Sequence, residues 1–221
     1  MCVNYRPPSP QLLNTVMGIM LNVDDPEAWK LETWKDYPAP IIRRDDAGGR
    51  EGLLASYGMI PAQHLPPGAK FDTMNARCET VGEKRAFARA WRNAQLCLVP
   101  MTAFYEPNYE RGKCRWMGIG MADDSLFAVA GLWREWPGPN GTAVSFTQLT
   151  INADEHPLMN RMQRPGDEKR SLVIVPRNEW DDWLHCADTE YARSFMRPFP
   201  ADQMKAWPKV PEPEDLQASL F

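Results

Sequence analysis

Cys2 is the residue whose chemistry depends most on its position in the chain. The sequence opens MCVNYRPPSP, and a small residue after Met1 usually allows the initiator methionine to be removed. Cys2 would then carry a thiol and a free α-amine, whose ordinary pKa values of about 8.5 and about 7.7 to 8.0 leave part of each group unprotonated near neutral pH. Both nucleophiles could capture one aldehyde. The alternative is a frayed, exposed terminus without a role.

Two polar stretches offer groups that could assist such chemistry. FDTMNARCET (71–80) places Asn75, Arg77 and Glu79 at alternate positions, so an extended backbone would project all three to one side. An ordinary solvated loop is the alternative. LVPMTAFYEPNY runs through aromatic residues to Glu106, and desolvation there would raise its pKa into the range useful for proton transfer. Alternatively, Glu106 lies at the surface end of a strand that Pro107 terminates.

A cationic cluster lies in the stretch INADEHPLMNRMQRPGDEKRSLVIV. We expect it to form a loop that either faces phosphates or is simply solvated. Its members are His156, Arg161, Arg164, Lys169 and Arg170.

Composition narrows the class of protein. The net charge of −4 and the pI of about 5.5 do not favour nucleic-acid binding by the chain as a whole, so any such binding needs a local basic patch. Five scattered cysteines without a CxxC pair argue against a disulfide framework and a zinc site, and we expect no metal or other cofactor. No apolar run is long enough to span a bilayer, and no signal peptide is evident, which predicts a cytoplasmic protein without a membrane partner.

The elements that must position these residues are short, because 21 prolines interrupt the chain. Helices are predicted at SPQLLNTVMGIML with Ser9 as N-cap, at 83–94, and as a final short helix at NEWDDWL with Asn178 as a cap. Strands are predicted at APII, GLLASYGMIP, LCLVP, RWMGIGM, LFAVAGLW, SFTQLTIN and SLVIVP. We therefore expect one α+β domain over residues 1–208, with a bent, mostly antiparallel sheet or partial barrel flanked by short helices. Residues 209–221 form a Pro- and Glu-rich tail that we expect to be flexible.

Five patches in a fixed order make the sequence resemble one family. They are Cys directly after Met, SYGMIP followed by NARCET, LCLVPMTAFYEPNY, FAVAGLW, and TINADEHPLM leading to PGDEKRSLVIVP. Together they resemble the SOS response-associated peptidase (SRAP) family, whose members sense abasic sites in single-stranded DNA. The resemblance extends from Met1 to about Trp183.

The resemblance implies that Met1 is removed, autocatalytically or by an aminopeptidase, and that Cys2 forms a thiazolidine crosslink with an abasic site. It implies that Asn75 hydrogen-bonds the sugar or the Cys2 terminus, that Glu106 shuttles protons, and that Arg77 holds a neighbouring phosphate. The implied protein is cytoplasmic and is associated with the nucleoid when it is on DNA.

The sequence departs from the family at three places, one of which is Pro107, where the family usually has an aromatic residue after its Glu. Many relatives continue Cys-Gly-Arg, whereas here Arg6 is the nearest cation to Cys2 and the expected candidate for a phosphate contact. The position of the family's active-site His is taken by Gln163, which cannot act as a general acid or base, and His156 lies seven residues earlier. Either His156 substitutes from a shifted loop, or the protein binds DNA with weakened or no chemistry; we favour loss of the His.

Two further hypotheses remain at this stage. An ordinary hydrolase would use Cys97 or Cys114 as the nucleophile, but no His lies in a motif with either cysteine. Separately, the terminus EDLQASLF resembles the short peptides with which bacterial replication proteins bind the sliding clamp. Leu220 and Phe221 would anchor in an apolar pocket while Gln217 bonds its rim; alternatively the segment folds back onto the domain.

Overall fold

The computed structural model describes residues 2–21, 28–69, 71–138 and 141–210. Its strands are β1 (Asn4–Arg6), β2 (Pro38–Arg44), β3 (Arg50–Tyr57), β4 (Asn75–Arg77), β5 (Leu96–Met101), β6 (Ala103–Asn108), β7 (Arg115–Met121), β8 (Phe127–Gly138), β9 (Gly141–Asn152), β10 (Arg170–Leu172), β11 (Ile174–Val175) and β12 (Met204–Pro208). Its α-helices are α1 (Pro10–Met17), α2 (Ala88–Arg92), α3 (Trp180–His185) and α4 (Thr189–Ala192). Short 3₁₀ turns are η1 (Ala62–His64), η2 (Met159–Arg161), η3 (Arg177–Glu179), η4 (Arg193–Phe195) and η5 (Ala201–Gln203).

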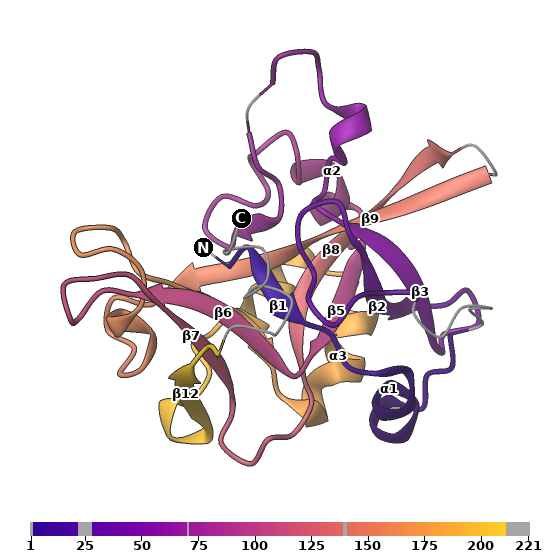
Figure 1. Cartoon of the computed structure of the whole chain (residues 1–221). Helices are drawn as coiled ribbons and strands as arrows, with labels where there is room; N and C mark the ends of the chain where they lie inside the picture. The colour runs from indigo at the N-terminus through magenta and orange to yellow at the C-terminus, as the bar shows by residue number, and fades with distance from the viewer. Residues whose placement is uncertain (1, 22–27, 70, 139–140, 211–221) are drawn as a thin grey trace, which may run out of the picture.

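Five strands close into a ring in the order β9, β3, β2, β5 and β8, because β8 pairs back to β9. Figure 1 shows the long β8 and β9 crossing the molecule, with the tip of their hairpin projecting from the body. A second, four-stranded sheet has the order β1-β6-β7-β12. Within the described residues every pairing between named strands is antiparallel except β3 with β9 and β4 with β9. The expected α+β domain with a mostly antiparallel partial barrel is therefore confirmed.

Alternation along the strands divides the core in two. Ile42 and Leu98 join a cluster that packs against the helices, which we call the helix-covered core, and its helical members include Trp91 and Trp183. Their neighbours Ile41 and Val99 join a second cluster with Cys2, Tyr5 and Phe104, which we call the N-terminal core. The N-terminal residues are thus packed into the fold rather than frayed.

Each predicted strand overlaps a strand of the structure, although SLVIVP is divided into β10 and β11 and the strand predicted at GLLASYGMIP ends at Tyr57. The helices also differ in detail. Ser9 caps α1 as expected, accepting a 3.2 Å hydrogen bond from the Leu12 amide. The helix predicted over 83–94 is wrong in its first half, since Phe87 has φ −117° and the helix begins only at Ala88. Asn178 is not a cap, because it lies within η3, which leads directly into α3. The helix expected to be last is followed by α4 and β12, which the sequence patterns did not reveal.

Pro107 and Lys209 also differ from the expectations. Pro107 does not end its strand, because β6 continues through Pro107 to Asn108 and pairs with β7. At the other end, β12 runs to Pro208, and the ammonium group of Lys209 pairs with Glu32 at 2.7 Å. Lys209 is therefore packed against the domain rather than part of a separate tail. The candidate clamp residues Gln217, Leu220 and Phe221 lie outside the described residues.

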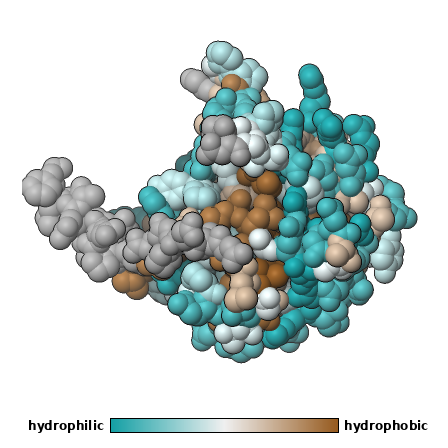
Figure 2. All heavy atoms as spheres, turned by 90° about the vertical axis from the view of Figure 1, so that its right-hand side faces the viewer, coloured by the Kyte–Doolittle hydropathy of each residue, from teal (hydrophilic) through white to brown (hydrophobic). Residues whose placement is uncertain are grey.

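The surface is uneven in polarity. Figure 2 shows the face that carries the tip of the β8–β9 hairpin, where apolar surface gathers in the middle and hydrophilic side chains surround it. No helix of the described residues is long and apolar enough to cross a membrane.

Candidate functional site

Pairing between β1 and β6 brings the N-terminus to the centre of the site. Asn4 lies opposite Tyr105, so Cys2 reaches the neighbourhood of Glu106. Cys2 is only 1% exposed, and its thiol donates to the backbone carbonyl of Asn4 at 3.2 Å. Burial, and then the negative charge of Glu106, raises the pKa of the Cys2 thiol to about 12. The thiol is therefore protonated at neutral pH in this arrangement.

The carbonyl group of Cys2 is held by two side chains. The Asn75 amide donates to it at 2.6 Å, and the Tyr57 hydroxyl lies 3.1 Å from it. The same hydroxyl lies 3.1 Å from Oε1 of Gln148, and since it has one proton it donates to one of the two at a time. Parallel pairing of β4 with β9 places Asn75 opposite Gln148. These contacts fix the backbone of Cys2 from one side.

Tyr57 and Gln148 are site residues that sequence reasoning missed. Tyr57 ends β3 and is fully buried, with its ring stacked on Phe146 at a centroid distance of 5.1 Å. Gln148 lies within β9, where polar and apolar residues alternate, and it is also fully buried. Two buried atoms at this place, Oδ1 of Asn75 and Nε2 of Gln148, have no hydrogen-bond partner among the described residues. Such atoms are expected where a polar ligand completes a site.

Glu106 lies in β6 and is 2% exposed. Burial raises its pKa to about 7, although a hydrogen bond from the Gln163 side chain acts in the opposite direction. A carboxyl group with this pKa can both give and accept a proton near neutral pH, which is the property expected of a general acid–base group. The alternative of a surface position at a strand end is excluded by its burial.

Gln163 has a structural role as well as a place next to Glu106. Its Nε2 donates to the Arg170 carbonyl, and its Oε1 accepts from the Arg170 amide, both at 3.0 Å. Its backbone is in the left-handed region with φ +63°. The side-chain amide of Gln163 therefore holds the loop before β10 to the first residue of that strand. It does not titrate, so it cannot act as a general acid or base.

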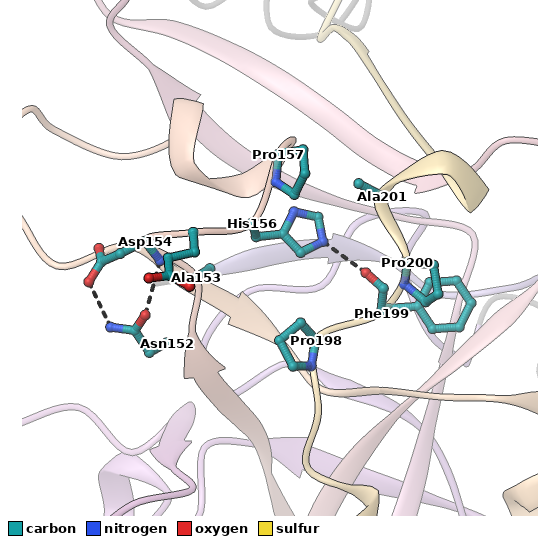
Figure 3. Close-up of a pocket in the computed structure, with 10 residues that line it drawn as sticks. Asn152, Ala153, Asp154, His156, Pro157, Pro198, Phe199, Pro200 and Ala201 are labelled. Atoms are coloured by element: carbon teal, nitrogen blue, oxygen red, sulfur yellow. Dashed lines mark hydrogen bonds between the residues drawn. The ribbon is translucent and has the colours of Figure 1, made fainter.

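His156 does not stand in for the missing base. Its Nδ1 accepts from the backbone amides of Leu158 and Met159 at 3.1 and 3.0 Å, so Nε2 carries the proton and donates to the Phe199 carbonyl at 2.8 Å. Figure 3 shows this bond across a pocket lined by Pro198 and Pro200. Both ring nitrogens of His156 are thus engaged with backbone groups, which corrects its expected place among the catalytic residues.

The expected cationic cluster is largely compensated by nearby groups. Arg170 is only 2% exposed and binds Glu79 and Glu168 at 2.7 to 2.9 Å, which corrects its expected place as a phosphate contact. Arg161 makes a bidentate pair with Glu110 at 2.8 and 3.0 Å.

The remaining expected cations lie in different surroundings. Lys169 donates to the Arg164 carbonyl at 2.6 Å, and the Arg164 side chain is exposed. Arg6 lines a pocket on the side of β12. Arg77 remains next to the site, 47% exposed, and pairs with Glu168 at 2.6 Å.

The two cysteines considered for a hydrolase lie in different surroundings. Cys97 is fully buried, and burial raises the pKa of its thiol far above the ordinary value. Cys114 is exposed. Within the described residues, no group of three or more His, Cys, Asp or Glu side chains is placed to hold a metal ion.

Comparison with solved structures supports the fold. A crystal structure of a Bordetella bronchiseptica protein superposes with a TM-score of 0.84 and 32% sequence identity, covering 95% of this chain and all of the other. A Bacteroides thetaiotaomicron protein has a TM-score of 0.72 at 21% identity, covering 94% of this chain and 91% of the other, and shares the fold.

Comparison of sequences gives the family. The abasic site processing proteins YoqW and YoaM of Bacillus subtilis (strain 168) are 29% and 30% identical to this chain over 169 residues. The matches cover 75% of this chain and 72% and 71% of the two relatives. The sequence model described as SOS response associated peptidase (SRAP) matches residues 1–212. The chain therefore belongs to the SRAP family.

Proposed function

We propose that the protein processes abasic sites in single-stranded DNA by forming a covalent crosslink through Cys2. The arrangement around Cys2 carries this proposal. The side chains of Asn75 and Tyr57 lie within hydrogen-bond distance of the Cys2 carbonyl. The Cys2 thiol lies near the buried Glu106, whose pKa is about 7. Relatives named abasic site processing proteins support the same substrate. The DNA would lie with its lesion at this buried end of β1.

The reaction requires that the Met1–Cys2 peptide bond is first hydrolysed, by the protein itself or by an aminopeptidase. The freed α-amine attacks the aldehyde carbon of the ring-opened sugar, and loss of water gives an imine. The sulfur of Cys2 then adds to the imine carbon, its proton passes to the nitrogen, and a five-membered thiazolidine results. Amine, thiol and aldehyde thus give the adduct and one water. The second step is intramolecular, which favours ring closure.

Three side chains have defined roles in this scheme. Asn75 and Tyr57 hold the backbone of Cys2 while its two nucleophiles react. Glu106 donates a proton to the departing hydroxyl group and accepts the proton of the thiol, for which a pKa of about 7 is suitable. Arg77, two residues along the extended β4 from Asn75, binds a neighbouring phosphate.

A second candidate function is supported by Gln163. The amide of Gln163 is hydrogen-bonded to the Arg170 backbone and has no titrating group, so this position supplies no proton transfer. In this second proposal the protein is a homologue that binds single-stranded DNA with little or no crosslinking. This candidate keeps the same DNA path and loses only the covalent step.

We also propose that the C-terminal segment tethers the protein to a sliding clamp through Gln217, Leu220 and Phe221. The sequence QASLF, which follows a Pro- and Glu-rich stretch, supports this proposal. A tether would raise the local concentration of the protein at replication forks without a new contact to DNA.

The function is tested by incubating the protein with a single-stranded oligonucleotide that contains one abasic site. We expect a protein–DNA band that resists denaturation. The mass of the adduct should equal that of the Met1-free protein plus the DNA minus one water. Cys2→Ala should abolish the band, whereas Cys114→Ala, at the exposed cysteine, should not. No adduct with wild type, together with retained binding of the same oligonucleotide, would support the second candidate instead. Absence of both adduct and binding would refute both.

A further inference from the structure

The strip Asn75, Arg77 and Glu79 leads from the reactive terminus to an ion network. Asn75 and Arg77 begin and end β4, and Glu79 lies in the turn that follows. Asn75 binds the Cys2 carbonyl, Arg77 binds Glu168, and Glu79 binds the buried Arg170. The cation closest to Asn75 along the strip therefore already has a carboxylate at its guanidinium group.

The two oxygens of Glu168 are bound differently. Oε2 pairs with Arg77 at 2.6 Å, while Oε1 accepts from Arg170 at 2.7 Å and from the Asn152 amide at 3.3 Å. Hydrogen bonds from Arg170 hold the pKa of Glu168 below its ordinary value, so the group is negatively charged at neutral pH. If the contact with Arg77 were lost, Oε1 of Glu168 would keep its hydrogen bonds from Arg170 and Asn152.

Arg170 does not depend on Glu168 alone. It is 2% exposed, and Glu79 binds both of its terminal nitrogens at 2.8 and 2.9 Å, with the Thr150 carbonyl as a further acceptor at 2.7 Å. Arg77, by contrast, is 47% exposed and Glu168 35% exposed. The bond between Arg77 and Glu168 is thus the solvent-accessible edge of the network, and it can open without stranding a buried charge.

We propose that Glu168 is an internal competitor for phosphate at Arg77, and that it weakens the hold of the protein on undamaged single-stranded DNA. A carboxylate and a phosphate present the same kind of oxygen acceptor to a guanidinium group, so a phosphate replaces Oε2 when DNA binds. Glu168 stays in place on Arg170 and Asn152, and its charge remains close to the incoming phosphate.

Glu168 would therefore affect reversible binding of DNA more than covalent binding. Undamaged DNA is released readily because the phosphate must displace Glu168, whereas DNA with an abasic site is retained by the bond to Cys2. This inference rests on the proposed function, because it takes DNA as the partner of Arg77.

The test is the affinity of Glu168→Gln for an undamaged single-stranded oligonucleotide, measured by fluorescence anisotropy at several salt concentrations. Gln keeps the shape and an acceptor oxygen but loses the charge. The matched control is Glu155→Gln, which makes the same change of charge at an exposed position of the loop before η2. Arg77→Gln and the double variant Arg77→Gln, Glu168→Gln complete a double-mutant cycle. Thermal unfolding of each variant confirms that the fold is intact.

Glu168→Gln should lower Kd about two- to fivefold at low salt, because an exposed ion pair has only a modest strength. The dependence of log K on log salt should become steeper by about 0.7, because Glu168 no longer offsets the charge that Arg77 presents to one phosphate of the single strand. Glu155→Gln should have a smaller effect, and Glu168→Gln should have no larger effect than Glu155→Gln when Arg77 is already replaced.

Equal effects of Glu168→Gln and Glu155→Gln, or tightening that persists without Arg77, would overturn the proposal while leaving the function untouched. Absence of DNA binding by wild type and by Glu168→Gln would overturn the proposed function and this inference together.

Discussion

Replacing Glu106 with Gln measures how much the buried, ionised carboxylate lowers the free energy of unfolding. The pKa of Glu106 rises from an ordinary 4.5 to about 7, chiefly through burial. Since one pKa unit corresponds to about 1.4 kcal/mol, ionisation of Glu106 is about 3 kcal/mol less favourable in the folded protein than in the unfolded chain. Gln has nearly the same shape and no charge, so it removes this cost.

The sign follows from proton binding. The folded protein binds the Glu106 proton more tightly than the unfolded chain does, so this group lowers stability as pH rises from 4.5 to about 7. Below pH 4.5 the group is protonated in both states and the cost is absent. Glu106→Gln should therefore gain stability relative to wild type between pH 4.5 and pH 8, by up to about 3 kcal/mol.

Urea unfolding of wild type and variant at pH 4.5, 6 and 8 gives the free energies, and the other titrating groups cancel in the difference. Glu83→Gln is the control for the loss of one carboxylate at an exposed position. A difference between wild type and Glu106→Gln that is constant over this pH range, or that turns against the variant at pH 8, would refute the assignment of Glu106 as a buried carboxyl group with a raised pKa. Crosslinking should be lost in the same variant, because the amide cannot transfer a proton.

Further predictions concern single contacts. Tyr57→Phe should slow crosslinking about tenfold without weakening binding of undamaged DNA, since the lost hydroxyl contacts Cys2 and Gln148; an equal loss of both would contradict the positioning role. Gln163→His should raise the crosslinking rate by restoring a proton-transfer group, and an unchanged rate in a folded variant would show that Gln163 does not occupy the catalytic position. Gly118→Ala should destabilise the protein by about 1 to 3 kcal/mol in urea unfolding, because the new Cβ would lie 2.6 Å from the Trp207 ring; unchanged stability would show that Trp207 moves away freely. A labelled peptide of residues 212–221 should bind purified sliding clamp, and the double change Leu220→Ala, Phe221→Ala should abolish binding; equal binding by both peptides would exclude the tether.

The strands could be predicted because apolar runs such as LCLVP have one assignment that buries both of their faces, and β5 places Leu98 and Val99 in different parts of the core. Closure of the barrel could not be predicted, because it depends on which strands pair over long distances in the sequence. Tyr57 and Gln148 were missed for the same reason. Nothing in the strands β3 and β9 distinguishes these two polar groups from their neighbours, and only the parallel pairing of β9 with β3 and β4 brings them to Cys2.

Alternation predicted an extended backbone from Asn75 to Glu79, but the strand β4 ends at Arg77 and Glu79 lies in the turn that follows. The cationic loop was harder to interpret, since a list of charges does not reveal which of them are compensated. Arg170 looks like its neighbours in the sequence, yet it is buried between Glu79 and Glu168. His156 similarly looks like a base, and two backbone amides fix its tautomer.

The protonation states around Cys2 determine the order of the proposed chemistry. In the chain that still carries Met1, burial raises the pKa of the Cys2 thiol to about 12, so the thiol carries its proton at neutral pH. We expect it to stay a poor first nucleophile after Met1 is removed, whereas an α-amine with an ordinary pKa near 8 is partly unprotonated. The amine therefore attacks the aldehyde first. Once the imine has formed, its carbon is electrophilic enough for sulfur to add as its proton leaves, and Glu106 is then the nearest acceptor with a suitable pKa. A site that keeps its thiol protonated until an imine is present reacts with aldehydes that its amine can reach and protects the sulfur from other electrophiles.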